Sequence, residues 1–475
     1  MDLNKFRKKF EQEAVKVMRD FKVPGMSVFV TKNGKTTYHR VFGLRERGDV
    51  KPATIDSLYG VSSITKSVTC MAILQLHEAQ KLNIHDPISK YVPVDLMFKE
   101  TPITIHHLMS HASGIPSLMT FYFSQMNQEL YEPVLPKLPL GNWDDFYFHL
   151  NDAKTEVLSP PCKKYYYWNA GFTLLGQIVE KTSGQLFEEY VKENILIPLE
   201  MKRSTFSKDD VERDDDVSKG YNYELKDKKV TRKPKNLLTD LFIAGAGGLI
   251  SSVKEITNYL LCHLNKGDFN GKKLLSEELI KEMWKPHNKN LASQYQEFCP
   301  GSNSSYGYGF RIYENYYGYT LVSHGGISGV TGGQVAFIPE LNLTFAQLYN
   351  VSWLPTHLMH TALALLLGKD PEKDMPYHIR KKHYKKLCGR YDAYKKTLTI
   401  EIKEKESILY LEGSWQEKFK LPLIPKNDGP EVMDFYVILP QGNMDVPFTK
   451  QDDGQITFDY ERHLMHKKTI ELEED

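Results

Sequence analysis

The sequence predicts a mixed α/β (α+β) fold: a mainly antiparallel sheet flanked by helices, a helical region beside it, and a separate small all-β domain. Two observations carry this prediction. Strand-like runs near the N-terminus return at residues 308–348, after many helical patterns, which is typical of one antiparallel sheet joining both ends of a domain. Later in the chain, short alternating runs are separated by turns that contain Asp428-Gly429, Gln441-Gly442 and Asp453-Gly454, which indicates a small barrel or sandwich.

Residues 3–21 are predicted to form an amphipathic helix. Apolar side chains recur at steps of three and four, which places them on one helix face: Leu3, Phe6, Phe10, Ala14, Val17 and Phe21. Two strand-like runs follow at 25–32 and 35–42. Asn33-Gly34 separates them, and this dipeptide between alternating runs favours a tight β-hairpin.

The middle of the chain is mostly helical in pattern. Residues 62–82 are strongly apolar with few charges, which predicts a helix buried inside the domain. Further helices are expected near 104–111, 170–192, 252–265 and 275–284, and further strands near 308–313, 318–323, 332–338 and 342–348.

Composition changes after Leu367. Residues 368–386 are charged, contain two prolines and lack a clear period, so the sequence predicts a linker there. Short strands are expected beyond it, at 397–402, 408–412, 435–439 and 456–460. The predicted organisation is a domain at 1–367, a linker at 368–386 and a small β-barrel domain at 387–475.

The overall composition excludes several classes of function. The 61 Lys and Arg residues nearly balance the 60 Asp and Glu residues, so no electrostatic footprint for nucleic acid or a membrane surface exists. The sequence contains no apolar run long enough to span a bilayer, and its N-terminus lacks the apolar stretch of a secretory signal. Five scattered cysteines without a CxxC pair argue against a disulfide framework and a structural zinc site. These features predict a cytoplasmic protein with reduced thiols.

The first candidate catalytic motif is Ser63-Ile64-Thr65-Lys66. Residues three apart share a helix face, so an amine at Lys66 could take or relay the serine proton if burial kept it partly neutral. A serine at the start of a helix also faces free backbone N–H groups and the positive end of the helix dipole. The alternative is a capping serine and a surface lysine, and we expect that role for a second copy, Ser251-Ser252-Val253-Lys254.

The second candidate is Tyr167-Trp168-Asn169. A phenolate is a competent base, but the tyrosine pKa of about 10 must be lowered by a neighbouring cation, which Lys66 could provide. The Asn169 amide could orient the lysine and bind a substrate carbonyl. The alternative is an aromatic strand or loop that only packs, since Tyr313-Glu314-Asn315 matches the same pattern.

The third candidate is His324-Gly325-Gly326, at the end of a predicted strand. Small residues there leave room for a substrate backbone along the sheet edge. The backbone N–H groups of Ile327 and Ser63 could form an oxyanion hole, and His324 could supply positive character near Tyr167. A glycine-rich turn that merely ends the strand is the alternative.

These three motifs occur in the order Ser-x-x-Lys, Tyr-x-Asn, then a basic residue followed by glycines. The segments around them also look like those of a single known family: VPGMSV at 23–28, LYGVSS at 58–63, ITI at 103–105, HLMSHASGIP at 107–116, NAGF and LLG within 169–176, and AGAGGLISS at 244–252. On these segments, roughly residues 3–367 resemble the class C β-lactamase, D-Ala-D-Ala carboxypeptidase and esterase family of penicillin-recognising serine hydrolases. The resemblance implies a β-lactamase/transpeptidase-like fold with its active site between the sheet and the helical region. It also implies Ser63 as nucleophile, with Lys66 and Tyr167 as its proton-handling partners.

His324 departs from the family pattern. Class C β-lactamases and transpeptidases usually carry lysine there, whereas some esterases, aminopeptidases and related peptidases of the family carry histidine. An exposed lysine is a cation at neutral pH, and a histidine often is not. The departure weakens the case for efficient lactam hydrolysis and predicts a weaker or pH-dependent grip on a substrate carboxylate.

The C-terminal segment shows a second resemblance. Cys388-Gly389-Arg390-Tyr391, followed by alternating strands, is similar to the lipocalin-like domain appended to some archaeal and bacterial peptidases of this family. Any small antiparallel β domain is the alternative. A domain of this kind would gate the cleft or build a homo-oligomer.

The predicted function is that of a serine hydrolase acting through an acyl-enzyme on amide or ester bonds, without a cofactor. Its substrate would be a peptide containing D-amino acids or another small molecule, as for a peptidase or esterase. The alternatives are a β-lactamase or penicillin-binding protein, and a non-catalytic relative that binds peptides in the same cleft. No metal site is predicted, because His106, His107 and His111 lack a companion carboxylate at ligand spacing.

Overall fold

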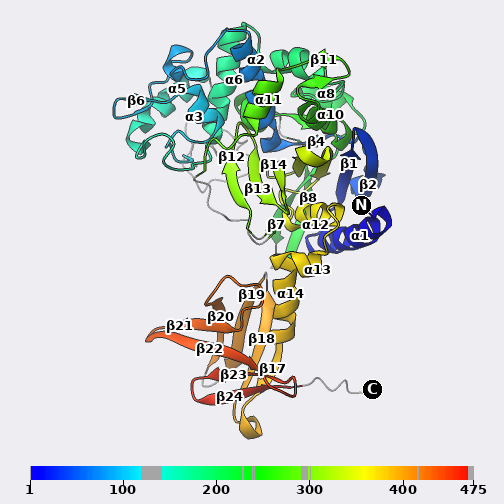
Figure 1. The fold of residues 1–475 in the computed structure, drawn as a ribbon, viewed down its shortest axis with the longest axis vertical. Coiled ribbons are helices and arrows are strands. Elements are labelled where there is room, and N and C mark those ends of the chain that lie inside the picture. The colour runs from blue at the N-terminus through cyan, green and yellow to red at the C-terminus, as the bar shows by residue number, and fades with distance from the viewer. Residues whose placement is uncertain are drawn as a thin grey trace. The chain divides into compact units, whose positions relative to one another are not determined.

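The computed structural model describes residues 2–118, 142–226, 229–237, 239, 241–289, 298–299, 301–405, 407–414 and 417–468 (Figure 1). The chain divides into two compact units, one made mostly of residues 8–359 and the other mostly of residues from 360 onward. The domain spans expected from the sequence, 1–367 and 387–475, include residues outside the described ranges. Each unit is taken by itself below.

An eight-stranded antiparallel sheet forms the frame of the first unit. Its strand order is β12-β13-β14-β15-β16-β1-β2-β3, so strands from both ends of the unit lie side by side. The junction is the pairing of β1 with β16, in which Val28 lies opposite Gln347. The strands are β1 (Gly25–Lys32), β2 (Lys35–Glu46), β3 (Lys51–Pro52), β12 (Asn303–Tyr306), β13 (Arg311–Tyr316), β14 (Tyr319–Ile327), β15 (Gly332–Ile338) and β16 (Leu343–Tyr349). The predicted sheet joining both ends is confirmed.

The N-terminal elements form as the sequence pattern predicts. Helix α1 (Leu3–Asp20) buries Phe6, Phe10, Ala14 and Val17, which are four of the six predicted stripe residues. The Phe10 ring meets Tyr38 on β2 edge-on, with ring centroids 6.0 Å apart. Between β1 and β2, Asn33 and Gly34 both have positive φ, which a tight hairpin turn with the right-handed twist of its strands requires.

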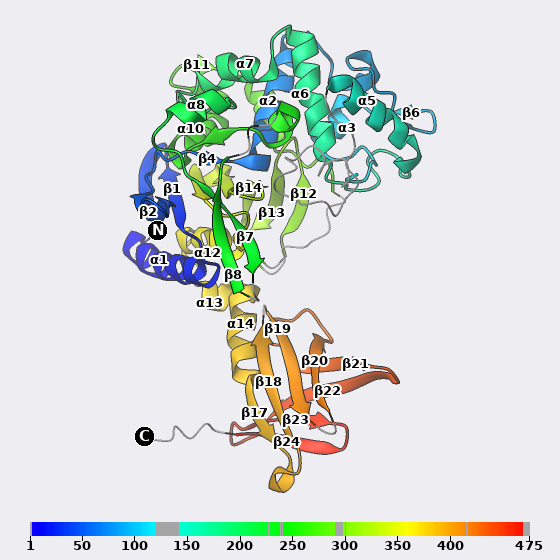
Figure 2. The same cartoon turned by 180° about the vertical axis from the view of Figure 1, so that it is seen from behind.

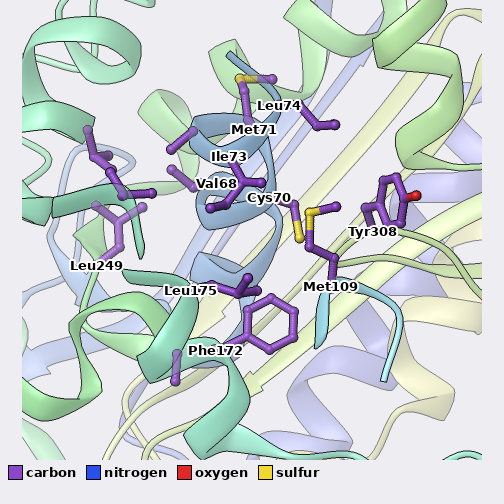
Figure 3. Close-up of a cluster of buried hydrophobic side chains, with 14 of the residues drawn as sticks. Val68, Cys70, Met71, Ile73, Leu74, Met109, Phe172, Leu175, Leu249 and Tyr308 are labelled. Atoms are coloured by element: carbon purple, nitrogen blue, oxygen red, sulfur yellow. The ribbon is translucent and has the colours of Figure 1, made fainter. Parts of the chain in front are cut away.

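Helices surround a central buried helix on one side of the sheet (Figure 1 and Figure 2). Helix α2 (Thr65–Glu78) follows the 3₁₀ turn η1 (Ser62–Ile64) and packs against α6, α7, α9 and α11. Figure 3 shows its side chains Val68, Cys70 and Met71 among Phe172, Leu175 and Met109 from neighbouring elements. Burial on all sides explains why the sequence pattern is apolar throughout rather than amphipathic.

The remaining elements of this unit are short helices and two-stranded ribbons. The helices are α3 (Ile105–Met109), α5 (Trp143–Asp152), α6 (Asn169–Ser183), α7 (Phe187–Val191), α8 (Lys208–Arg213), α9 (Ala244–Gly247), α10 (Val253–Leu264) and α11 (Glu277–Met283). The ribbons pair β4 (Tyr59–Gly60) with β9 (Ile250–Ser251), β5 (Met97–Phe98) with β6 (Thr101–Pro102), β7 (Gly220–Lys226) with β8 (Lys229–Lys235), and β10 (Asp268–Phe269) with β11 (Lys272–Lys273). Helix α12 (His357–Leu366) follows β16 along the chain.

Residues 368–386 are helical where the sequence led us to expect an aperiodic linker. Helix α13 spans Pro371–Asp374 and α14 spans Pro376–Leu387. Each proline stands at the first turn of its helix, where its missing N–H costs nothing, so the two prolines mark helix starts rather than a break. Tyr384 and Leu387 of α14 are buried in the core of the β domain, and that packing gives the charged helix its stability.

Eight antiparallel strands close the C-terminal unit into a barrel. They are β17 (Gly389–Asp392), β18 (Thr399–Lys405), β19 (Ile408–Ser414), β20 (Lys418–Pro425), β21 (Asp434–Leu439), β22 (Gly442–Lys450), β23 (Ile456–Tyr460) and β24 (His463–Lys467). Closure comes from β17, which pairs with both β18 and β24. Apolar side chains fill the interior, among them Ile400, Leu411, Phe435, Phe448 and Phe458. The predicted small barrel is confirmed, although the sequence pattern alone revealed only four of its eight strands.

Candidate active site

Ser63 lies where an extended segment turns into the buried helix. The pairing of β4 with β9 delivers the chain to η1, and Ser63 is the one position from Ser57 to Leu74, a fully described stretch, that is not buried. Ser62 just before it has a positive φ of 52°, a conformation that costs a non-glycine residue about 1–3 kcal/mol. The Ser62 hydroxyl donates to the carbonyl oxygen of Ile327 at 2.7 Å, which holds this strained turn against β14.

Lys66 lies directly beneath the serine. Its Nζ is 3.0 Å from Ser63 Oγ, and it donates to the carbonyl oxygen of Ala246 at 2.6 Å. The side chain is fully buried, and no carboxylate among the described residues pairs with it. Burial therefore lowers the pKa of Lys66 well below its usual value of 10.5. A neutral amine at this distance can accept the hydroxyl proton of Ser63.

The ring of Tyr167 lies near the amine of Lys66. The Lys66 Nζ is 4.9 Å from the centroid of the Tyr167 ring and 5.4 Å from that of Phe172. Tyr167 is partly exposed, whereas Trp168 after it is buried. Asn169 is partly exposed as the first residue of α6, a helix that packs against α2. Its role in orienting the lysine stays a prediction.

The end of β14 approaches the serine turn closely. The pairing of β13 with β14 ends at Arg311 and Ser323, whereas β15 continues to pair with β14 as far as Ile327. On the side of β14 that faces β13, residues 324–327 therefore do not pair with another strand. The turn η1 lies against β14. A Cβ atom on Gly326 would come within 2.0 Å of the Val61 carbonyl oxygen, so only glycine permits this approach.

His324 is buried, and its lowered pKa disfavours the positive character expected of it from the sequence. Its Nδ1 lies 2.7 Å from the Gly325 carbonyl oxygen, which can only accept, so Nδ1 carries the hydrogen. Its Nε2 therefore accepts from the Tyr306 hydroxyl at 2.9 Å. Burial, with the nearby charge of Arg311, lowers the pKa of His324 to about 3. Both ring nitrogens are engaged within the protein, and a ring with the lowered pKa holds one proton at neutral pH, on Nδ1, and no charge.

Three residues of this site were not singled out from the sequence as participants. Tyr306 donates to His324, the Ala246 carbonyl accepts from Lys66, and the buried His111 lies 4.2 Å from Tyr167, centroid to centroid. Ala246 and His111 belong to the family-like segments 244–252 and 107–116, which could have pointed to them. Tyr306 carries no such signal, because it meets His324 only through the register of β12 and β13 beside β14.

The alternative roles assigned to other motifs are visible in the structure. Ser252 caps α10, since its hydroxyl accepts from the Glu255 N–H at 3.1 Å, and Lys254 pairs with Asp56 at 3.1 Å. This second Ser-x-x-Lys copy is therefore structural, as predicted. His107 takes part in the capping box of α3, and His106 Nδ1 lies 2.7 Å from the Tyr308 hydroxyl.

No three His, Cys, Asp or Glu side chains in the described part of the chain are arranged to hold a metal ion. Among the helices that the structure describes, none combines the length and apolar character needed to cross a membrane.

Comparison with known proteins places this geometry in a family. A family model described as Beta-lactamase matches residues 10–368. The chain belongs to the Beta-lactamase family. A second model, described as the Pab87 octamerisation domain, matches residues 371–466, which contain α13, α14 and the barrel. The chain thus has a Beta-lactamase domain followed by a barrel domain that matches a second family model.

Individual relatives agree with this assignment. The octameric penicillin-binding protein homologue from Pyrococcus abyssi is 34% identical, with a TM-score of 0.84 over 98% of this chain and 100% of that chain. A class C beta lactamase from Rhodobacter sphaeroides is 18% identical, with a TM-score of 0.59 over 77% of this chain and 99% of that chain, which shows a shared fold. Protein flp of Staphylococcus aureus (strain MW2) is 26% identical over 285 residues, or 59% of this chain. The chain spans about half the length of that curated relative, since the match covers 51% of it.

Proposed function

We propose that this protein is a serine hydrolase that forms an acyl-enzyme on Ser63 with an ester or amide substrate. The observation that carries the proposal is the 3.0 Å contact between Ser63 Oγ and an amine whose pKa is lowered by burial. A neutral lysine is a base, whereas a charged one could only donate. Membership of the Beta-lactamase family supports the same chemistry.

The proposed reaction has two halves. Lys66 takes the proton of Ser63 as Oγ attacks the substrate carbonyl, and the N–H groups of Ser63 and Ile327 receive the developing oxyanion. The C–O or C–N bond then breaks, and the proton reaches the leaving group by way of Lys66 or Tyr167. Water, activated by Tyr167, attacks the acyl carbon, and the proton returns to Ser63. Asn169 and the strand 324–327 would hold the substrate.

We propose peptides containing D-amino acids or simple esters as the substrate class. The lowered pKa of His324 supports esters, and peptides bound without a free carboxylate at this position, over penicillins, because a penicillin carries a carboxylate that the lysine of other family members would bind. A β-lactamase or penicillin-binding protein remains the second candidate. The penicillin-binding protein homologue from Pyrococcus abyssi, which is 34% identical, favours it. Binding without catalysis is disfavoured, because a binding cleft gains nothing from a buried amine beside a serine.

The first prediction concerns covalent labelling. When the protein is mixed with a panel of p-nitrophenyl esters, nitrocefin and short D-peptides, we expect intact-mass spectrometry to show an added acyl group with at least one ester or peptide. Ser63→Ala should show none, because the nucleophile is missing. Fast turnover of nitrocefin with no reaction toward the others would select the β-lactamase candidate. An unchanged mass together with no turnover of any probe would contradict the proposed hydrolase.

The second prediction concerns assembly. We propose that the chain forms a homo-oligomer through its barrel. Residues 371–466 match an octamerisation domain, which supports the proposal. The octameric homologue, whose match covers 98% of this chain, supports it as well. Light scattering of the full chain should give a mass near eight times 54.9 kDa that persists on dilution. A mass of 54.9 kDa at every concentration would contradict it.

A further inference from the structure

His111 holds the backbone on both sides of Tyr167. The N–H of Tyr166 donates to the His111 carbonyl oxygen at 3.3 Å. The N–H of Trp168 donates to His111 Nδ1 at 3.1 Å. The residue between them, Tyr167, also has its ring against the imidazole, with centroids 4.2 Å apart and planes tilted by 37°. One histidine thus engages three successive residues of the candidate catalytic segment.

The histidine is itself rigidly held. It is 1% exposed, and its N–H donates to the Leu108 carbonyl oxygen at 3.2 Å. The Asn288 side-chain amide donates to the His111 carbonyl oxygen at 3.1 Å. His111 has a positive φ of 52°, a conformation uncommon outside glycine that histidine, like asparagine and aspartate, adopts more often than other residues. Strain of this kind persists only where the surroundings enforce it, and it is concentrated at functional sites.

The bond from Trp168 fixes the tautomer of the ring. An acceptor Nδ1 carries no hydrogen, so the proton of the neutral ring is on Nε2. Nε2 is buried without a hydrogen-bond partner among the described residues. Burial lowers the pKa of His111 well below 6.5, so the acceptor at Nδ1 is present throughout the neutral range. The rings of Phe172 and Tyr306 also pack near the imidazole of His111, with ring centroids 5.0 and 4.8 Å from its own.

The bond also has a place in the fold. Trp168 precedes α6 as its N-cap residue, and its own side chain makes no capping hydrogen bond. Its backbone N–H is buried with it and needs an acceptor, which the imidazole provides. The position of Tyr167 relative to Lys66 is therefore set by a side chain from the turn after α3, more than fifty residues earlier in the chain.

We propose that His111 is the positioning residue of Tyr167, acting through its ring acceptor on Trp168 and its carbonyl oxygen on Tyr166. This inference rests on the proposed function, because it is there that Tyr167 transfers a proton. His111 itself takes no part in the chemistry. A shift of about 1 Å in a proton-transferring group can cost about 100-fold in rate, so loss of the clamp should lower kcat far more than it changes KM.

Two variants separate the acceptor from the mere presence of a ring. In His111→Asn, Oδ1 replaces Nδ1 as acceptor and asparagine tolerates the positive φ. In His111→Phe, an aromatic ring remains but the Trp168 N–H loses its acceptor. With the best ester substrate, we expect H111F to lower kcat about 100-fold with KM nearly unchanged, and H111N to stay within about tenfold of the wild type. A residue that only fills space would give the opposite order.

Amide hydrogen exchange of the full-length protein gives a readout that needs no turnover. Exchange at Trp168 should be faster in H111F than in the wild type and close to the wild type in H111N. Asn288→Ala, which leaves the ring in place, should give a smaller acceleration and covers the case in which H111F does not fold. Equal exchange in all variants, or full kcat in folded H111F, would overturn the clamp. A wild type without any acyl adduct would instead overturn the proposed function, while the exchange data still decide the clamp.

Discussion

Replacing Lys66 with methionine is expected to slow acylation of Ser63 by about 10⁴-fold, with the fold retained. Methionine matches the length of the lysine side chain and suits a fully buried position. It cannot take the hydroxyl proton that we propose Nζ, 3.0 Å away, receives. The measurement is the second-order rate of fluorophosphonate labelling, followed by intact mass. Lys254→Met is the matched control, since Lys254 belongs to the structural Ser-x-x-Lys copy and should label at the wild-type rate.

The pH profile of the same reaction tests the charge of the amine. The neutral form is the base, and burial lowers the pKa of Lys66 well below 10.5. The wild-type rate should therefore rise with pH through this lowered pKa and be flat well before pH 10.5, and K66M should lack this rise. The unfolded chain holds the proton more tightly than the folded one, so stability also rises with pH between the lowered pKa and 10.5. A rise in rate centred near pH 10.5, or rapid labelling of K66M, would contradict the assignment.

The second large effect is expected from Gly326→Ala. The new Cβ would lie 2.0 Å from the Val61 carbonyl oxygen and 3.1 Å from Ser62 Cβ, so β14 must move away from the serine turn. That movement would break the bond from Ser62 to Ile327 and separate the two proposed oxyanion donors. Losing one such donor costs about 10²–10³-fold in kcat, and overpacking of this kind costs about 1–3 kcal/mol of stability.

Gly325→Ala is the control for this variant. The nearest atom to a Cβ there is the Gly333 carbonyl oxygen at 3.7 Å, an ordinary contact, and neither glycine has a positive φ. Urea unfolding of both variants should therefore show G325A close to the wild type and G326A destabilised. Ester turnover by G326A should be impaired as well. Wild-type turnover by G326A would mean that the close approach of β14 to η1 is not needed for catalysis.

Local patterns predicted much of the framework. The α1 stripe, the Asn33-Gly34 hairpin and the buried run after Ser62 each depend on residues close together in sequence, and each formed as expected. The Ser63–Lys66 pair is of the same kind, because three residues of helical chain bring the two side chains onto one face. The helices at 371–387 were missed because prolines at helix starts were taken as breaks, and their stability comes from packing on the barrel core.

The chemistry of the site depended on partners that are distant in sequence. The charge of His324 follows from burial and from the Tyr306 hydroxyl, which lies on another strand. The hold on Tyr167 comes from His111, whose ring nitrogen finds Trp168 only in the folded chain. Sequence spacing could name the residue types required for acyl transfer, but it could not show which ring nitrogen donates or which backbone N–H lacks an acceptor.

The most direct test of the central claim is to locate the acyl group. The wild-type protein is trapped with a slowly hydrolysed ester or a fluorophosphonate, digested, and its peptides are sequenced by mass spectrometry. The account predicts a single modified side chain, Ser63, and no modification of Ser252 in the structural copy of the motif. An adduct on any other residue, with Ser63 unmodified, would contradict it.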